Sequence, residues 1–249
     1  MTLPSAVRDL PSVGLAELTE RAGLLTRHDR KYVLRTGELD RLLPALVRDA
    51  QVLDIDGIRL FRYASVYFDT PELTSFRLTA LRRRHRFKIR TRTYVDSGTC
   101  WLEVKTEGRR GGTVKTRLPY AASDDRDVTP GRWFVEQSLP TPPGALEAVL
   151  TTAYRRCTLL LPGSCSRVTI DVGPSWADLT GDRLDLPGLA VVETKTGAGA
   201  CAADRLLWAH GHRPTAISKY ATGLAALRPY LPSAPWRRLL RRHFVPEEQ

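Results

Sequence analysis

The sequence predicts an α+β fold whose sheet is mainly antiparallel. Strand-like segments are joined by short turns such as Asp96-Ser97-Gly98 and Pro162-Gly163, which is typical of hairpins. Segments with apolar residues at helical spacing lie before and after these strands. Charged residues also recur at alternate positions within the strands, so each set points to one face of its strand. This pattern is typical of a solvated surface sheet, and also of a barrel with a charged lumen.

The first part of the chain alternates helices and strands. The spacing of apolar residues predicts a helix over 13–24, a strand over 26–35 and a helix over 38–49. Pro44 lies inside the second helix and is expected to kink or split it. A β-rich run over 58–69 ends at Thr70-Pro71, where Thr70 is expected to cap a short helix that ends near Leu81.

Most of the remaining chain is predicted to form hairpins. Strands are expected at about 84–95, 100–106, 112–119, 152–161, 166–173 and 189–195, with a turn at Gly111-Gly112. The stretches 121–131 and 140–144 are interpreted as loops, and 121–144 as an insertion within one domain. Helices are expected over 199–210 and 219–230, and a basic amphipathic helix over 236–244. We expect one domain over residues 1–249, with its core at about 27–222.

Composition favours an anionic partner. The chain has 249 residues, 38 Lys and Arg against 27 Asp and Glu, and a formal net charge of +11. This surplus suits nucleic acid, a phosphate-rich small molecule or an acidic membrane surface, and does not choose among them. The four cysteines are widely scattered, no apolar run reaches the roughly 20 residues of a membrane span, and the N-terminus lacks an apolar signal stretch. We therefore expect a soluble cytoplasmic protein.

Two strand segments pair a carboxylate with a lysine on one face. They are Glu103-Val104-Lys105 and Glu193-Thr194-Lys195. Such a pair is typical of a surface salt bridge, but it also suits a metal-ligand carboxylate beside a phosphate-binding lysine, because Mg²⁺ and Mn²⁺ prefer oxygen ligands and often bridge to phosphates. Ser218-Lys219-Tyr220 precedes a helix, where an N-cap serine with a surface lysine is a commoner arrangement than an anion site.

The sequence lacks several well-known nucleotide and catalytic motifs. It contains no Gly-x-x-x-x-Gly-Lys-[Ser/Thr] loop, no Gly-x-Gly-x-x-Gly and no Gly-x-Ser-x-Gly. None of the five histidines has the spacing of a metal-ligand pair.

An ordered set of short motifs resembles the VTC domain, the polyphosphate polymerase module of the vacuolar transporter chaperone complex, which is also found in stand-alone bacterial proteins. This family belongs to the triphosphate tunnel metalloenzymes. The motifs span about residues 27–222 and are Arg27-His28-Asp29-Arg30-Lys31-Tyr32, Tyr67-Phe68-Asp69-Thr70, Lys88 to Tyr94, Leu102-Glu103-Val104-Lys105, Lys115-Thr116-Arg117, Tyr154-Arg155-Arg156, Arg167 to Asp171, Val192 to Lys195 and Ser218-Lys219-Tyr220. No single motif is specific, but the ordered set is.

The resemblance implies an antiparallel β-barrel tunnel with helices packed outside and cations inside. By position, the family's catalytic phosphate-binding residues match Lys31, Arg90, Arg92, Lys105, Lys115, Arg156, Arg167 and Lys219. Substrate-binding neighbours are expected at Ser218, Arg117, Lys195 and Tyr154. Glu193 matches the metal-binding glutamate, and Glu103 is expected as a second metal ligand. Glu103 and Asp171 are expected on the same lumen face. The implied cofactor is Mn²⁺ or Mg²⁺, and all of these side chains are expected to share one lumen.

Two departures from the superfamily narrow the expectation. Asp29-Arg30-Lys31 stands where the triphosphatase and adenylyl cyclase branches carry Glu-x-Glu-x-Lys, which favours the VTC branch. The membrane helices and the phosphate-sensing SPX domain of the eukaryotic assemblies are not found in this sequence. Coupling of synthesis to membrane translocation is therefore not expected from this chain.

The resemblance predicts a polyphosphate polymerase that uses ATP and inorganic polyphosphate. The alternatives are a metal-dependent triphosphatase of the same fold and a non-catalytic module that binds polyphosphate or nucleotide. No nucleic-acid partner is expected, and the sequence does not specify the oligomeric state. The segment 236–244 is expected to pack on the barrel, with peripheral membrane contact as the alternative.

Overall fold

The computed structural model describes residues 5–23, 28–107, 112–197 and 199–244. Its strands belong to one hydrogen-bonded sheet with the order β2-β11-β9-β8-β4-β5-β6-β7, to which β1, β3 and β10 are attached. Apart from the parallel pair β1–β3, the strand pairs whose register is described are antiparallel. The α+β class and the antiparallel sheet are therefore confirmed. Among the described strands the path of pairing is open and ends at β2 and β7.

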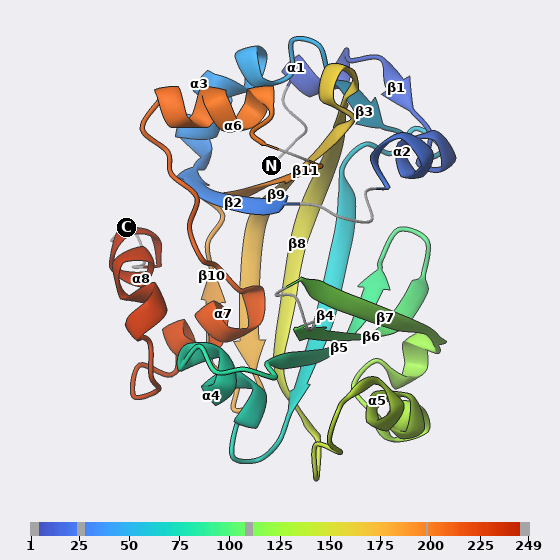
Figure 1. Cartoon of the computed structure of the whole chain (residues 1–249), viewed down its shortest axis with the longest axis vertical. Coiled ribbons are helices and arrows are strands. Elements are labelled where there is room, and N and C mark those ends of the chain that lie inside the picture. Colours follow the sequence, from blue (N-terminus) through green and yellow to red (C-terminus); the bar gives the residue numbers. More distant parts are fainter. Residues whose placement is uncertain (1–4, 24–27, 108–111, 198, 245–249) are drawn as a thin grey trace. The chain divides into compact units, whose positions relative to one another are not determined.

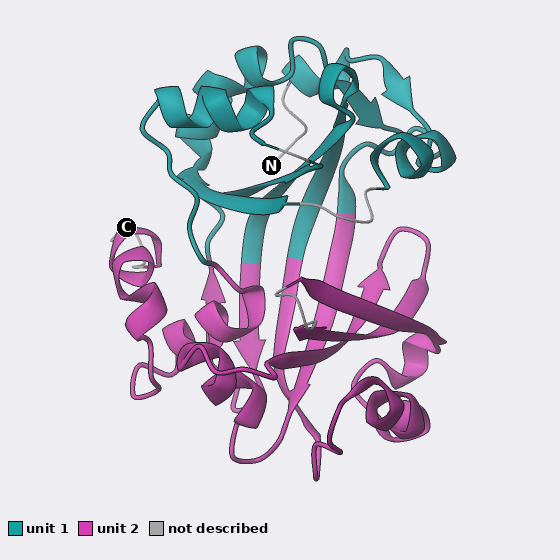
Figure 2. Cartoon of the chain, viewed as in Figure 1, with its two compact units in different colours: residues 1–61, 154–174, 186–216 teal, residues 62–153, 175–185, 217–249 magenta. Residues whose placement is uncertain are grey.

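The chain divides into two compact units, each built from separate stretches of sequence (Figure 2). Unit 1 contains residues 1–61, 154–174 and 186–216, and unit 2 contains residues 62–153, 175–185 and 217–249. Strands β8 and β9 each supply residues to both units. The expectation of one domain over residues 1–249 stays a prediction.

Unit 1 is a sheet with helices packed on it (Figure 1). Its elements are α1 (Ser5–Arg8), β1 (Ser12–Val13), α2 (Leu15–Ala22), β2 (His28–Arg35), α3 (Thr36–Leu46), β3 (Gln51–Leu53), the end of β8 (Glu147–Leu161), the start of β9 (Ser166–Asp178), β11 (Leu189–Thr196) and α6 (Ala202–Ala209). The leucine stripe of α3 is buried against Leu34, Ile170 and Val192 of three neighbouring strands. Apolar residues at every second strand position therefore face the helices, which leaves the alternate positions for the other face.

Helix α3 continues through Pro44, so of the two expected effects, a kink or a split, the split does not occur. Proline removes one N–H donor within a helix and crowds the preceding turn. Here the helix ends at Leu46, only two residues later, so little helix follows the disruption. Burial of Leu39, Leu42 and Leu43 in the core of unit 1 holds the preceding turns.

Unit 2 contains the other strands and helices. They are β4 (Phe61–Asp69, of which Phe61 belongs to unit 1), α4 (Thr74–Ala80), β5 (Phe87–Tyr94), β6 (Thr99–Glu107), β7 (Thr113–Tyr120), α5 (Arg132–Ser138), the start of β8, the end of β9, β10 (Arg183–Asp185), α7 (Lys219–Leu227) and α8 (Arg237–His243). Val135 of α5 is buried with Val66, Ile89 and Leu102 on one face of β4, β5 and β6. Helix α5 lies between the two predicted loops, at 132–138, where the sequence predicted no element.

The N-cap position of α4 is Leu73 and not the expected Thr70, and the Asp69 side chain satisfies donors of the first turn. The helix begins at Thr74, and the Asp69 carboxylate accepts hydrogen bonds from the backbone N–H groups of Ser75 and Phe76 at 2.8 and 2.9 Å. These belong to the first-turn groups that lack partners within a helix. The Thr70 hydroxyl accepts from the N–H of Thr74 at 3.2 Å and shares a hydrogen bond of 2.8 Å with the Thr74 hydroxyl. The expected turn at Gly111-Gly112 involves Gly111, which lies outside the described residues, as does Arg27.

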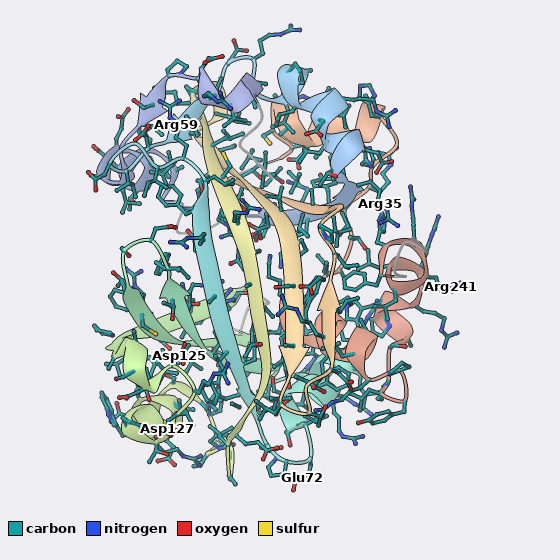
Figure 3. All side chains as sticks on the ribbon, turned by 180° about the vertical axis from the view of Figure 1, so that it is seen from behind. Arg35, Arg59, Glu72, Asp125, Asp127 and Arg241 are labelled. Atoms are coloured by element: carbon teal, nitrogen blue, oxygen red, sulfur yellow. The ribbon has the colours of Figure 1, made fainter. Side chains whose placement is uncertain are left out.

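Helix α8 packs on unit 2 through its apolar side. Trp236, Leu239 and Phe244 are buried, and the Trp236 ring lies 6.2 Å from that of Phe76. The arginines of α8 are exposed, and Figure 3 shows Arg241 extending away from the helix. Packing on the fold is therefore confirmed for this helix. None of the helices within the described ranges has the length and apolar character needed to cross a membrane.

Candidate functional site

The face of the unit 1 sheet opposite α3 carries alternating charges. Strands β2, β11 and β9 are in register, with Asp29 opposite Lys195 and Lys31 opposite Glu193. On the other side of β11, Arg167 lies opposite Lys195. The alternation predicted from sequence therefore converges across three adjacent strands.

Glu193 is an ionised carboxylate surrounded by cations. Its Oε1 lies 2.6 Å from the Lys195 Nζ, and its side chain is 15% exposed. Burial alone would raise the pKa of Glu193, but the nearby charges of Lys31, Lys195 and Arg156 outweigh burial and hold the pKa well below its usual range. Glu193 therefore supplies a permanent negative charge near neutral pH.

Arg156 is held in a fixed orientation on β8. Its guanidinium donates two hydrogen bonds to Asp171 of β9, at 2.5 and 2.8 Å, in a bidentate pair. Although burial opposes the charge, Asp171 raises the pKa of Arg156. The guanidinium also lies 5.3 Å from the centre of the Tyr154 ring. Asp171 thus orients the guanidinium of Arg156.

The residues around Glu193 fit the divalent metal that the resemblance implies. Within the described ranges, no group of three or more His, Cys, Asp or Glu side chains could hold a metal ion. Glu193 has Thr169 directly opposite it on β9, and the buried Thr169 hydroxyl has no hydrogen-bond partner among the described residues. One carboxylate and one neutral oxygen fit a Mg²⁺ or Mn²⁺ ion that takes its other ligands from water and substrate phosphates.

A buried network fixes the strands that present this cluster. The Asp204 carboxylate of α6 is fully buried and accepts hydrogen bonds from the hydroxyls of Tyr32 and Thr194, both at 2.7 Å. Tyr32 follows Lys31 on β2, and Thr194 lies between Glu193 and Lys195 on β11. Asp204 therefore ties α6 to the backbone positions that carry the charged side chains.

Unit 2 has its own charged face on β5, β6 and β7. Lys88, Lys105 and Lys115 lie directly opposite one another in one cross-strand row. Arg90, Glu103 and Arg117 form the next row. Like charges opposite each other destabilise a sheet, so a row of three lysines suits a surface that holds an anion. Lys88 completes the row, although it was not among the predicted site residues.

Glu103 neutralises part of this surface. Its Oε2 accepts hydrogen bonds from Arg90 at 2.5 and 2.8 Å, and its Oε1 forms an ion pair with Lys115. Burial would raise the pKa of Glu103, but the charges of Arg90, Arg92 and Lys115 hold the pKa far below its usual range. Burial in turn lowers the pKa of Lys115. Both Glu103 oxygens are engaged by cations, and the expectation that Glu103 is a metal ligand stays a prediction.

Lys219 stands at the start of α7, which is anchored through its neighbours. The Ser218 hydroxyl accepts a hydrogen bond from the N–H of Ala221 at 3.2 Å, so Ser218 is the N-cap. The Trp176 Nε1 donates a hydrogen bond to the Lys219 carbonyl at 2.7 Å. The Tyr220 hydroxyl donates to Asp69 at 2.6 Å. The backbone at Lys219 is thus fixed from both sides.

The same tyrosine links α7 to the unit 2 charged face. The Tyr220 ring stacks on Tyr67 with the ring centres 5.1 Å apart, and the Tyr67 hydroxyl accepts a hydrogen bond from Arg90 at 3.0 Å. Sequence reasoning quoted Asp69, Tyr67 and Tyr220 as motif residues but gave them no role. Their positioning role depends on contacts between residues about 150 positions apart, which no local pattern reports.

The predicted site residues fall into two groups within the described ranges. Unit 1 gathers Lys31, Tyr154, Arg156, Arg167, Glu193 and Lys195, and unit 2 contains Arg90, Arg92, Glu103, Lys105, Lys115, Arg117, Ser218 and Lys219. That all of them line one lumen stays a prediction.

One protein-family model matches part of the chain. Residues 26–131 match the VTC domain. Similar solved structures include a proposed adenylate cyclase from Vibrio parahaemolyticus (14% identity, 81% of this chain and 99% of that chain, TM-score 0.46) and one from Bacillus halodurans (13%, 90% and 94%, 0.46). A third is a proposed adenylyl cyclase from Hippeastrum with a dominant triphosphatase activity (13% identity, 79% of this chain and 94% of that chain, TM-score 0.44). No curated protein sequence matches the chain.

Proposed function

Because residues 26–131 match the VTC domain, we propose that this protein is a metal-dependent polyphosphate polymerase. It transfers the terminal phosphoryl group of ATP to the end of an inorganic polyphosphate chain. The bond from the γ-phosphorus to the bridging oxygen breaks, ADP leaves with that oxygen, and a terminal phosphate oxygen of the acceptor forms the new phosphoanhydride bond.

The charged face of unit 2 is the observation that carries this proposal. Three adjacent strands present six cations and one carboxylate on one face, namely Lys88, Arg90, Arg92, Lys105, Lys115, Arg117 and Glu103. Repulsion within this surplus would be relieved by a multiply charged anion bound close by. Arginine forks bind phosphate oxygens bidentately and lysines act as point charges, so a condensed phosphate fits this surface.

Phosphoryl transfer needs positioning and charge stabilisation more than covalent catalysis. Arg156 is oriented by Asp171, and Arg90 by Glu103 and Tyr67, so both guanidinium groups are held before substrate arrives. The acceptor is a phosphate that is already ionised near neutral pH, so the reaction requires no strong general base. In agreement with this, no histidine takes part in the described ion pairs of the two charged clusters.

Glu193 would hold the metal, with Thr169 beside it. A bound divalent cation would neutralise charge on the phosphate oxygens during transfer. Lys31 and Lys195 keep Glu193 ionised at the pH of the reaction, which is the condition for that role. ATP and polyphosphate are the proposed partners, and the cytoplasm is the proposed location.

The test is to supply ATP with Mn²⁺ or Mg²⁺ and to separate the products on a gel. Long phosphate chains are expected. Free phosphate without chains would contradict the polymerase and indicate a triphosphatase, in which water replaces the phosphate acceptor.

A Glu193→Gln variant separates an enzyme from a simple binding module. The change removes the negative charge but keeps the shape, so we expect tripolyphosphate to bind while product formation is lost. Titration with Mn²⁺ in the presence of tripolyphosphate should show weaker metal binding than in the wild type. A wild-type protein that binds tripolyphosphate with no turnover under any metal would support the binding module.

A further inference from the structure

Two hydroxyl groups in unit 2 are buried without a hydrogen-bond partner among the described residues. They are the Ser65 Oγ on β4 and the Thr152 Oγ1 on β8. Ser65 is 3% exposed and Thr152 is 4% exposed. Buried hydroxyls in folded proteins nearly always have a partner, and leaving one without a partner costs stability. Neither residue was singled out by the sequence.

The two hydroxyls lie on neighbouring strands. Strands β4 and β8 are hydrogen-bonded neighbours in the sheet. Residues 64–66 and 151–153 border the same cavity of about 220 Å³. Asp125, which accepts a hydrogen bond from Thr91 on the Val66 face, also borders it. Ser65 and Thr152 therefore stand at the same level of the sheet.

Ser65 belongs to the charged face of unit 2. It lies directly opposite Arg92 of β5, which is itself 9% exposed. The next residue along β4, Val66, is buried in the apolar core on the other side of the sheet. Because successive strand residues point to opposite faces, Ser65 shares its face with Arg90 and Arg92.

Trp176, on the strand next to Thr152, connects this part of the sheet to Lys219 of α7. Trp176 on β9 lines the cavity beside Thr152, and its Nε1 donates to the Lys219 carbonyl. Arg92, Ser65, Thr152 and Trp176 thus stand on adjacent strands. We name Arg92, Ser65 and Thr152 the hydroxyl row.

We propose that the hydroxyl row is a binding subsite for an anionic phosphoryl oxygen, with Ser65 and Thr152 as hydrogen-bond donors and Arg92 as the charge. A metal cation does not suit this row, because the cationic Arg92 lies directly opposite Ser65. A phosphoryl group presents oxygens that accept from hydroxyl and guanidinium donors together. The subsite rests on the proposed function, since it would bind one phosphoryl group of the condensed phosphate.

Matched variants separate this role from a structural one. Ser65→Ala and Thr152→Val remove a hydroxyl that has no partner in the fold, so urea unfolding should occur at the same or a higher concentration than in the wild type. Binding of inorganic tripolyphosphate, measured by calorimetry on the full chain, should weaken about tenfold for each lost donor. Thr152→Ser keeps the hydroxyl and should restore binding.

Ser75→Ala is the matched control in the same unit. Ser75 is fully buried, and its hydroxyl donates to the Phe87 carbonyl at 2.5 Å. This variant should unfold at lower urea but bind tripolyphosphate as the wild type does. Unchanged binding in both Ser65→Ala and Thr152→Val would overturn the proposal, as would a loss of stability equal to that of Ser75→Ala.

The same data keep this proposal apart from the proposed function. Tripolyphosphate binding is measured without turnover. If the wild type binds it and the variants do not, but no polyphosphate forms from ATP, the subsite stands and the polymerase fails. If polyphosphate forms and the variants bind normally, only the subsite is wrong.

Discussion

Replacing Gly223 by alanine tests how α7 is held. Within a helix, this change usually stabilises a protein by about 1 kcal/mol, because glycine is a poor helix former. In α7, however, a Cβ on residue 223 would lie 2.1 Å from Trp176 Cδ1 and 2.2 Å from Trp176 Nε1. Trp176 is buried, and its Nε1 donates to the Lys219 carbonyl. The added methyl group must therefore displace either the indole or the helix.

We expect Gly223→Ala to destabilise the protein, whereas the same change in an ordinary helix stabilises it. Overpacking costs roughly 1–3 kcal/mol and the lost hydrogen bond about 1 kcal/mol, against the helix gain of about 1 kcal/mol. We expect Gly223→Ala to lower the free energy of unfolding by about 1–3 kcal/mol, measured by urea titration with circular dichroism. Displacement of Lys219 should also weaken tripolyphosphate binding.

Gly37→Ala is the control for this prediction. Gly37 lies in α3, and a Cβ added there meets no atom within 4 Å. This variant should be as stable as the wild type or slightly more stable. The packing argument is refuted if Gly223→Ala unfolds at the same or a higher urea concentration than the wild type.

Three further predictions follow from the same structure. Because the fold lowers the pKa of Glu103, ionised Glu103 stabilises the protein fully above its unfolded pKa of about 4.3, and this stabilisation is lost as the pH falls towards the folded pKa. The urea concentration at the midpoint of unfolding should therefore fall below about pH 4.3 in the wild type, and fall less in Glu103→Gln. Arg90→Ala should abolish polymer synthesis and lower the free energy of unfolding by about 3 kcal/mol, since it removes a buried partner of Glu103. Lys219→Ala should abolish synthesis with little loss of stability, and unchanged synthesis in both variants would reject the site assignment. Trp236→Ala should lower the free energy of unfolding by about 3 kcal/mol, because the apolar side of α8 is buried in the protein. The variant should pellet with neutral lipid vesicles to the same extent as the wild type, and a lost vesicle interaction at wild-type stability would contradict this packing.

Local patterns were sufficient where the structure depends on neighbouring residues. The alternation of Glu193 and Lys195 placed both on one strand face, and the leucines of α3 gave the helix and its buried side. Local patterns failed at α5, where a short helix lies in a polar stretch and is held by Val135 in the core of unit 2. They also failed at Asp69, whose capping role requires the chain to turn back after β4.

The sequence by itself determined the antiparallel strands, their charged faces and the ordered motifs, because a strand has a period of two residues whatever its partners are. Only the tertiary structure decided the register that sets Lys88, Lys105 and Lys115 in one row. It also decided the pairing of Arg156 with Asp171, and it placed Ser65 and Thr152 at the same level of the sheet. Register depends on pairing between distant segments and on the burial of their opposite faces, and neither is encoded within any one segment.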